Sequence, residues 1–214
     1  MTVGQRMTKN PITVKIDTPV SEAQYTMRKE KVHRFPVVDK ELRLKGIVTE
    51  KDLLYATPSP ATTLDVYEMS YLLSKLKVDE VMTSELVTVV EDTPIEEAAR
   101  ILVDNNIGGL PVLRDGKLVG IITESDVFKV FLEMFASRKK GVRMTMVVPE
   151  QTGELAKLAG AVSSIGGNIV ALGTFLGDDA SQTLLTMKVQ DVSADDLKQV
   201  VTPFVKKIVD TRVI

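Results

Sequence analysis

A short phrase that occurs twice constrains this sequence more than any other feature. Residues 46–52 read Gly-Ile-Val-Thr-Glu-Lys-Asp, and residues 120–126 read Gly-Ile-Ile-Thr-Glu-Ser-Asp. Each copy passes from a glycine through two β-branched residues to a Thr-x-x-Asp step, a pattern typical of a short buried strand that turns into a helix. The first N–H groups of a helix have no partner within it, so a hydroxyl and a carboxylate placed there can help to hold a sugar phosphate.

The same step also has a purely structural interpretation. Thr49 with Asp52, and Thr123 with Asp126, match a capping box, in which both side chains bond to the helix backbone. A single Thr-x-x-Asp step is more often a cap than a ligand site. The duplication favours a ligand site, because each step closes a longer repeat.

Segments 3–53 and 78–127 align as two copies of one unit. The shared landmarks are Met7-Thr8 and Met82-Thr83, Asp17-Thr18-Pro19 and Asp92-Thr93-Pro94, and Pro36-Val37 and Pro111-Val112. The offset is 75 up to the prolines and 74 afterwards, because the loop between the last two strands is shorter by a single residue in the second copy. Agreement of this kind predicts two copies of one folding unit.

Each copy predicts the element order β-α-β-β-α. A β-prone segment leads into a helix for which Thr18 or Thr93 is the expected cap, with proline at the first helical position. The positions expected to face the core recur at helical spacing: Val20, Ala23 and Met27, and Ile95, Ala98 and Leu102. The expected strands are 12–16, 35–38 and 44–48, and 87–90, 110–113 and 118–122. Asp115-Gly116 predicts a tight hairpin turn.

Composition argues against several classes of function. A chain of 214 residues fits one or two domains, and a net charge of -2 with mixed signs indicates no nucleic-acid or membrane partner. The chain has no cysteine and a single histidine, His33, which argues against disulfides, metal sites and a Ser-His triad. It has no P-loop, no signal peptide and no apolar run of about 18 residues, so we expect a cytoplasmic protein without catalytic residues.

The linked motifs of residues 1 to 135 resemble tandem CBS domains, the Bateman module. The resemblance implies a pseudo-twofold pair of units with clefts that bind adenosine-containing ligands. It places Asp52 and Asp126 on the ribose hydroxyls, and Thr49 and Thr123 near phosphate. The expected division is CBS domain 1 at 1–56, an inter-repeat loop and helix at 57–77, and CBS domain 2 at 78–137.

His33-Arg34 lies in a stretch that resembles the gamma subunit of the AMP-responsive kinase, where basic residues face nucleotide phosphates. Arg34 can give forked, charge-assisted hydrogen bonds, and a protonated His33 would add charge. Taken by itself, the pair is more typical of a solvated strand edge. The second copy has Gly108-Gly109 at this position and no side-chain donors, so we expect unequal sites. The expected nucleotide-binding residues are Ile12, Val32, His33, Arg34, Thr49, Asp52, Val87, Ile107, Gly108, Thr123 and Asp126.

The residues between the repeats predict a loop over 56–63, rich in Pro, Ser and Thr, and a helix over 64–76. The helix carries Tyr67 and Tyr71 on one of two apolar faces, a surface broad enough to need burial. The resemblance to the acetoin-utilisation regulatory proteins places such an insertion near the join of the repeats or at a dimer contact. A spacer helix that closes the module is the alternative.

A second domain is expected at 142–214, after a helix that ends in the basic run 137–141. Its strands are predicted at 142–148, 169–176, 183–189 and 208–214, with a turn at 177–179. One helix should bury Leu155, Leu158, Ala159, Val162 and Ile165, and the other, capped by Ser193, should bury Leu197, Val200 and Val201 and break at Pro203. This β-α-β-β-α-β order is the ferredoxin-like topology.

The turn at 149–155 and the Gly-Gly-Asn step at 166–168 resemble an ACT domain, a regulatory module that pairs across chains and often binds amino acids. Gly153 would let helix amides approach a carboxylate, whereas Glu150 and Thr152 depart from the family's turn. The resemblance makes Glu150, Gly153 and Asn168 candidate amino-acid-binding residues. Dimerisation without an amino acid is the alternative.

The whole chain resembles the acetoin-utilisation regulatory proteins. We therefore expect an α+β, non-catalytic sensor, in which the CBS pair binds AMP, ADP, ATP or another adenosine compound and the ACT domain holds a homodimer. The regulated protein is not indicated. A ligand-free dimerisation scaffold for a metabolic enzyme or regulator is the alternative, and an enzyme is the least supported class.

Overall fold

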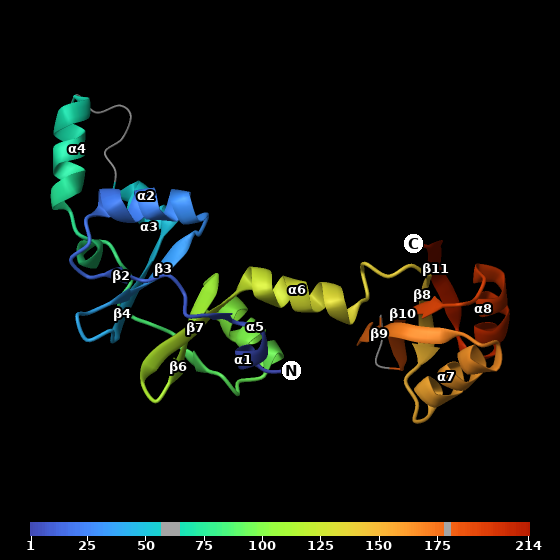
Figure 1. Ribbon diagram of the computed structural model, residues 1–214. Helices are drawn as coiled ribbons and strands as arrows, with labels where there is room; N and C mark the ends of the chain where they lie inside the picture. Colours follow the sequence, from blue (N-terminus) through green and yellow to red (C-terminus); the bar gives the residue numbers. More distant parts are fainter. Residues whose placement is uncertain (57–64, 178–180) are drawn as a thin grey trace. The chain divides into compact units, whose positions relative to one another are not determined.

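The computed structural model describes residues 1–56, 65–177 and 181–214 (Figure 1). These residues form two compact units, Met1–Val127 and Phe128–Ile214, and the division falls within helix α6 (Glu124–Met134). The predicted inter-repeat loop from residue 57 on, Leu64 and the turn residues 178 and 179 lie outside the described residues. No described helix has the length and apolarity needed to cross a membrane.

Unit 1 contains the predicted β-α-β-β-α arrangement twice. The first copy comprises β2 (Val14–Lys15), α2 (Val20–Glu30), β3 (Arg34–Val38), β4 (Leu44–Thr49) and α3 (Glu50–Tyr55). The second comprises β5 (Val89–Val90), α5 (Ile95–Asp104), β6 (Gly109–Arg114), β7 (Lys117–Thr123) and α6. In both copies the first strand is parallel to the second, and the second is antiparallel to the third.

The helices of the repeat bury the predicted positions but begin differently from the prediction. Every expected core residue of α2 and α5 is buried: Val20, Ala23, Met27, Ile95, Ala98 and Leu102. The prediction that Thr18 and Thr93 cap these helices is wrong, because the following prolines occupy the N-cap positions. The hydroxyls instead accept hydrogen bonds from the preceding strands, from Lys15 N at 3.1 Å and Val90 N at 3.2 Å. They close the strand-to-helix turns.

The two hairpins explain the change of offset between the copies. Asp115 and Gly116 both have positive φ angles, 50° and 74°, as a tight type I′ turn requires, and Arg114 pairs directly with Lys117. The first hairpin uses a longer turn, in which Asp39 N bonds to Arg43 O. The extra residue is absorbed in this loop, so the strands keep the same pairing in both copies.

The segment that precedes each copy of the repeat pairs with the last strand of the other copy. Strand β1 (Thr8–Lys9) pairs with β7, and Thr83 forms the equivalent bridge with Ile47. A Cβ on Gly120 would lie 2.2 Å from the sulfur of Met7, and a Cβ on Gly46 would lie 2.4 Å from the sulfur of Met82. The glycine that opens each seven-residue phrase is therefore needed for the close approach of a methionine from the other copy.

The residues before these paired segments also make equivalent hydrogen bonds to the other copy. Helix α1 (Val3–Arg6) donates Val3 N to Thr93 O of the second copy, and the 3₁₀ turn Val78–Glu80 donates Val78 N to Thr18 O of the first, both at 2.9 Å. These two equivalent hydrogen bonds connect the copies to each other.

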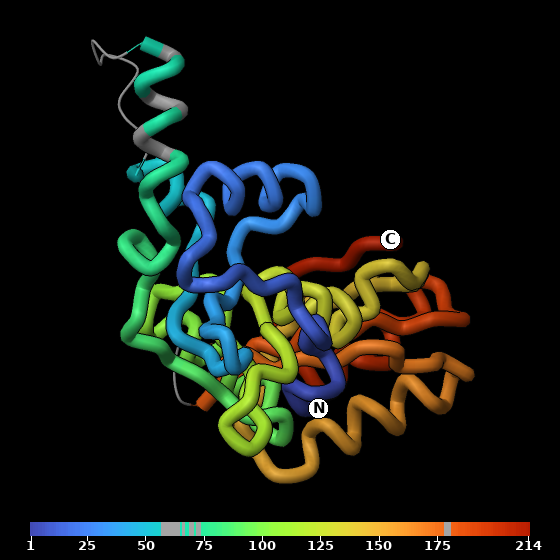
Figure 2. The backbone as a smooth tube through the Cα atoms, turned by 60° about the vertical axis from the view of Figure 1, so that its left-hand side comes forward, coloured from blue at the N-terminus to red at the C-terminus, as the bar shows by residue number. Residues whose placement is uncertain are grey.

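The helix between the copies, α4 (Val66–Lys75), packs against α2. Figures 1 and 2 both show it projecting beyond the sheets of unit 1. Tyr67 is 85% exposed and Tyr71 is 63% exposed, so the face that carries the two tyrosines is not buried within the described part of this chain.

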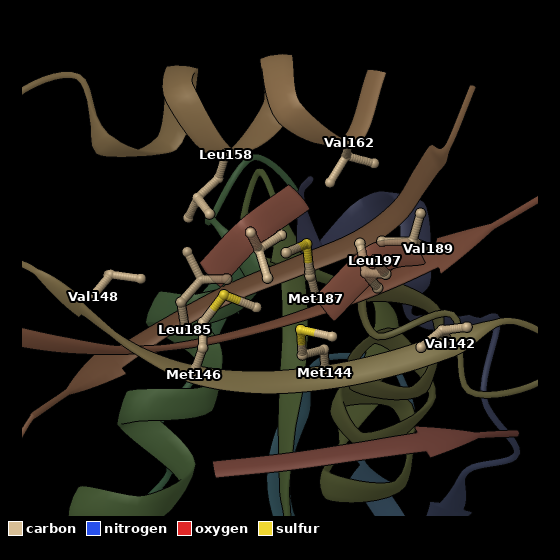
Figure 3. Close-up of a cluster of buried hydrophobic side chains, with 11 residues drawn as sticks. Val142, Met144, Met146, Val148, Leu158, Val162, Leu185, Met187, Val189 and Leu197 are labelled. Atoms are coloured by element: carbon tan, nitrogen blue, oxygen red, sulfur yellow. The ribbon is translucent and has the colours of Figure 1, made fainter. Parts of the chain in front are cut away.

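Unit 2 has the predicted β-α-β-β-α-β order. Its elements are β8 (Val142–Pro149), α7 (Glu154–Ser164), β9 (Asn168–Leu176), β10 (Gln182–Gln190), α8 (Ala194–Val201) and β11 (Lys207–Val213). The strands form one antiparallel sheet in the order β11-β8-β10-β9. Figure 3 shows Leu158 and Val162 of α7 above Met146 and Met187 of the sheet, and Leu197 of α8 completes the same core.

The helices of unit 2 follow the prediction in part. Ser193 caps α8 by accepting a hydrogen bond from Asp196 N at 3.1 Å, and a 3₁₀ turn that contains Pro203 follows the end of α8. Leu158 and Val162 are buried as predicted, but Leu155 and Ala159 are exposed. Glu154 takes the inward position of the first turn, and Lys157 donates to its carboxylate at 2.6 Å.

The opposite face of this sheet is covered by the segment that follows α6. Lys188 of β10 is only 4% exposed, and its ammonium donates to Ala136 O at 3.0 Å and to Lys139 O at 2.7 Å. The Phe135 ring stacks on Phe175 with centroids 6.1 Å apart. The segment 135–139 is therefore part of unit 2, and the backbone of the basic run 137–141 accepts hydrogen bonds from the sheet.

Candidate functional site

Unit 1 contains a cavity of about 680 Å³ that both copies line. Its volume lies in the range usual for small-molecule sites, roughly 300–1,000 Å³. The first copy contributes the ends of β3 and β4 and the first turns of α3, and the second contributes the segment before β5 and the loop from α5 to β6. Seven of the residues predicted from the sequence line it: His33, Arg34, Thr49, Asp52, Val87, Ile107 and Gly108.

The Thr49–Asp52 corner is a capping box. Asp52 Oδ2 accepts hydrogen bonds from Thr49 N at 2.8 Å and from the Thr49 hydroxyl at 2.7 Å, while Asp52 N lies 3.3 Å from Thr49 Oγ1. The structural interpretation of this step is thus confirmed. The corner also lines the cavity, and among the described residues no donor bonds to the second oxygen, Asp52 Oδ1. One carboxylate can therefore cap α3 and still accept a hydrogen bond from a ligand.

The Thr123–Asp126 corner repeats this geometry but does not line the same cavity. Asp126 Oδ2 accepts from Thr123 N at 3.1 Å and from the Thr123 hydroxyl at 2.7 Å, and Asp126 is only 8% exposed. Ile12 and Val32, which the prediction grouped with these residues, also lie outside the cavity, and Ile12 is 42% exposed. The structure thus brings the predicted residues together at one corner of the pair only.

Arg34 is the half-buried cation of the cavity. Its guanidinium lies against the second copy, since a Cβ on Gly108 would be 2.5 Å from Nη2 and a Cβ on Gly109 would be 2.6 Å from Nη1. Burial lowers the pKa of Arg34 below its ordinary value, and attraction to Glu124 partly offsets that effect. Guanidinium stays protonated even so. Within the described part of the chain, no carboxylate forms an ion pair with Arg34 and no acceptor bonds to it, so its donors are available to an anion.

His33 is paired with a glutamate at the surface. Its Nδ1 lies 2.8 Å from Glu50 Oε2, and the two side chains are 79% and 62% exposed. A pair this exposed contributes little to stability, and Glu50 already occupies Nδ1 of the ring. Arg34 is therefore the main candidate for a phosphate contact.

Several lining residues were missed by sequence reasoning. Arg28 and Gln24 lie one helical turn apart on α2, and Glu85 and Leu86 directly precede Val87. Asn106 lies in the loop after α5 with a φ of 51°. The spacing of Arg28 and Gln24 on the polar side of α2 was a usable signal. No sequence feature indicated that the loop after α5 would meet α2 and α3 in one cavity, because that depends on how the copies pack.

Unit 2 has a cavity of its own, of about 920 Å³. Glu150 and Gly153 line it, and the Glu150 carboxylate accepts a hydrogen bond from the Thr183 hydroxyl. Gly153 is the N-cap of α7 with a φ of 92°, which favours glycine. Asn168 lies elsewhere, at the other end of β9 opposite Gln190. The three candidate amino-acid-binding residues thus do not form one site.

No group of three or more His, Cys, Asp or Glu side chains is arranged to hold a metal ion in residues 1–56, 65–177 and 181–214.

Comparison with known proteins places unit 1 in a family. The model of the CBS domain matches residues 3–59 and 78–133. A CBS domain-containing protein from Dictyostelium discoideum is 36% identical over 133 residues, which cover 62% of this chain and 92% of that protein.

Solved structures agree with this match. A Vibrio cholerae protein named for acetoin utilization (AcuB) is 29% identical with a TM-score of 0.53, over 64% of this chain and 95% of that one. The CBS domain pair of protein MJ0100, in complex with 5-methylthioadenosine and S-adenosyl-L-methionine, is 28% identical with a TM-score of 0.52, over 65% and 98%. CBSX2 in complex with AMP is 36% identical with a TM-score of 0.50, over 61% and 96%. This chain belongs to the CBS domain family and contains two copies of the domain.

Proposed function

We propose that this protein is a non-catalytic regulator whose CBS pair binds an adenosine-containing ligand in the cavity beside Asp52. One observation carries the proposal: a half-buried guanidinium, Arg34, has no ion-pair or hydrogen-bond partner among the described residues and faces the same cavity as a carboxylate at a helix N-terminus. In the described part of the chain only a distant carboxylate attracts this half-buried cation, so it gains from an anion that binds it directly. A ligand with a sugar diol and a phosphate satisfies both groups.

The lining residues suggest a role for each part of such a ligand. Asp52 Oδ1 would accept hydrogen bonds from the ribose hydroxyls, and Arg34 would donate a forked pair to phosphate. Val87 and Ile107 supply apolar surface for adenine. AMP and S-adenosyl-L-methionine, found in complexes of two related CBS proteins, share the adenosine part and differ in charge. AMP, ADP and ATP fit the cation better than an uncharged adenosine compound.

The Asp126 corner supports a second, weaker ligand site of the same type. Its hydroxyl and carboxylate are arranged as at Asp52, although Asp126 is more buried. Ligands held between the copies would favour one relative orientation of the two domains in proportion to their differential affinity for the two states. That shift in population is the proposed signal.

Unit 2 supports the proposal of an ACT domain that holds a homodimer. Its β-α-β-β-α-β order, its β11-β8-β10-β9 sheet and the Gly153 turn fit that family's pattern. The cavity at Glu150 and Gly153 is the proposed place for an amino acid. Sedimentation would test the dimer. A thermal-shift panel of free amino acids would test the cavity, and its failure would leave dimerisation as the only role.

Calorimetry with AMP on a matched pair of variants tests the ligand site. Asp52→Ala and Asp126→Ala remove the same type of cap, so they should lose similar stability, about 1 kcal/mol each. Asp52→Ala should weaken AMP at the first site at least about ten-fold, because it removes hydrogen bonds to a charged acceptor. Asp126→Ala should leave that site intact.

The rival function is a ligand-free scaffold, and the caps favour it, because both Thr-x-x-Asp steps already serve their helices. Unchanged AMP affinity in Asp52→Ala, Asp126→Ala and the double variant would remove both acids from the site. If the wild-type protein bound no nucleotide at all, the scaffold would be the remaining function.

A further inference from the structure

The guanidinium of Arg34 lies against two glycines of the second copy, Gly108 and Gly109, and we call this place the Arg34 seat. Gly108 and Gly109 are the repeat equivalents of His33 and Arg34, at the offset of 75. The space that their side chains would fill holds the Arg34 guanidinium, with Nη2 2.5 Å from a Cβ on Gly108. Neither glycine has a positive φ angle, so the backbone alone would tolerate other residues there. The lack of side chains at the two glycines leaves the space that the guanidinium of the other copy occupies.

A glutamate shares this seat. Glu124 Oε2 lies 3.0 Å from the same Cβ position on Gly108, and its charge acts on Arg34 without forming a direct ion pair among the described contacts. Glu124 is the first residue of α6 and stands two positions before Asp126. Glu124 is itself exposed, whereas Arg34 is half-buried, so salt screens their attraction less than it would between two fully exposed charges.

The first copy offers a contrast at the equivalent position. Glu50 opens α3 as Glu124 opens α6, at the offset of 74, but it pairs with His33 in an exposed contact of 2.8 Å. The first glutamate of each closing helix thus faces one member of the His33-Arg34 pair. Both glutamates are exposed, but Arg34 is half-buried where His33 is exposed, and the attraction between Arg34 and Glu124 crosses from one copy to the other.

We propose that Glu124 is a built-in counter-ion of Arg34 that competes with the ligand's phosphate, so that it sets how strongly the Asp52 cavity prefers phosphorylated ligands. When phosphate takes the donors of Arg34, Glu124 loses its attraction and gains a neighbour of like charge. Occupancy of the Asp52 cavity is thereby linked to the first turn of α6 and to the corner that carries Asp126. This inference rests on the proposed function of the cavity.

Calorimetry with AMP and with adenosine tests the competition. Glu124→Gln removes the charge and keeps the size of the side chain, so AMP should bind about ten-fold more tightly, as expected when one like charge is removed beside a half-buried cation. Adenosine affinity should not change. Glu50→Gln is the matched variant, and its effect on AMP should be smaller because its pair is exposed. In an Arg34→Ala background, Glu124→Gln should lose most of its effect.

A second variant tests the seat itself. Gly108→Ala places a methyl group where the guanidinium lies, and only the far end of a flexible side chain has to move. AMP affinity should change several-fold relative to adenosine, with little loss of stability. Gly160→Ala, at a helical glycine with no atom within 4 Å of the added Cβ, is the control and should leave both affinities unchanged.

The possible outcomes separate this inference from the proposed function. If the wild-type protein binds neither AMP nor adenosine, both are overturned. If it binds AMP but Glu124→Gln changes the affinities for AMP and adenosine equally, or changes neither affinity, only the counter-ion role is overturned. A selective gain for AMP that disappears without Arg34 supports it.

Discussion

Asp52 caps a helix with one carboxylate oxygen and leaves the other available to a ligand. Its Oδ2 accepts two hydrogen bonds from Thr49, and the other oxygen is not engaged by the described residues. Capping and ribose binding are therefore compatible, and a stability loss in Asp52→Ala does not distinguish them. Affinity has to be compared at a temperature where both aspartate variants remain folded.

Asp39, in the first hairpin turn, should make part of the protein's stability sensitive to acid. Burial pushes the pKa of its carboxyl upward, but hydrogen bonds from the backbone and guanidinium of Arg43 outweigh this and hold it at about 2, against an ordinary 3.8. Because the folded-state pKa is depressed, the stabilisation is complete above about pH 4 and is lost as the pH falls toward 2. Urea denaturation between pH 5 and pH 3 should show a shallower decline for Asp39→Asn.

Arg43→Ala provides the control for this prediction. It removes the guanidinium that bonds to Asp39 but leaves the carboxyl in place, so it should flatten the same part of the pH profile to a smaller degree. Parallel profiles for the wild-type protein and Asp39→Asn would show that Asp39 has the same pKa in the folded and unfolded chain.

The sequence predicted single residues where local chemistry decides their role. The Thr49–Asp52 step and the Asp115-Gly116 turn depend on neighbours in the chain, and both were predicted with their geometry. Thr18 was predicted wrongly because a hydroxyl before a proline can bond forward to the helix or back to the strand. The seat of Arg34 on Gly108 could not be predicted, because it depends on contacts between the copies.

At the scale of elements, burial on one face of a helix or sheet was predictable only where the apolar pattern was narrow. The stripe of α5 has a single apolar face and was predicted correctly. In α7 the apolar residues spread over a wider arc, and packing chose Leu158 over Leu155, which is 47% exposed. Strand β1 was not predicted, because two residues carry no periodicity and their partner belongs to the other copy.

Lys188 should be the residue that fastens the segment after α6 to the sheet of unit 2. Lys188→Met keeps the length of the stem but removes the donor to Ala136 O and Lys139 O. Two partly buried carbonyls then lose this partner, which should cost about 1–3 kcal/mol in the free energy of unfolding. Urea denaturation measures the loss, and amide exchange at residues 136–141 should accelerate.

Lys198→Met is the matched control, since Lys198 is an exposed lysine of α8. Its effect should stay within about 0.5 kcal/mol, as for most surface substitutions. If Lys188→Met were as mild as the control, the segment 135–139 would be held by apolar packing, which includes the buried Ala136 and the contact of Phe135 with Phe175.

At the scale of the whole molecule, the candidate ligand site belongs to unit 1, and α6 continues from that unit into the next. The repeat predicted two units of one fold, but not which segments of the two copies would share a cavity. Residues 47–54 meet 83–87 and 106–111 there, through packing that no short stretch of sequence encodes.

The division into two units predicts how a ligand changes stability across the chain. A ligand that binds only the folded form of unit 1, supplied at about 100 times its dissociation constant, should stabilise that unit by about 2.7 kcal/mol. Amides of β4 and β6 that exchange only when unit 1 unfolds should then slow about 100-fold with AMP. Amides of β8 and β10 in unit 2 should keep their rates. Hydrogen exchange on the full-length chain measures both sets, and at the same AMP concentration Asp52→Ala should reduce the slowing in unit 1 to about ten-fold or less. Equal slowing in β10 would mean that the two units unfold as one.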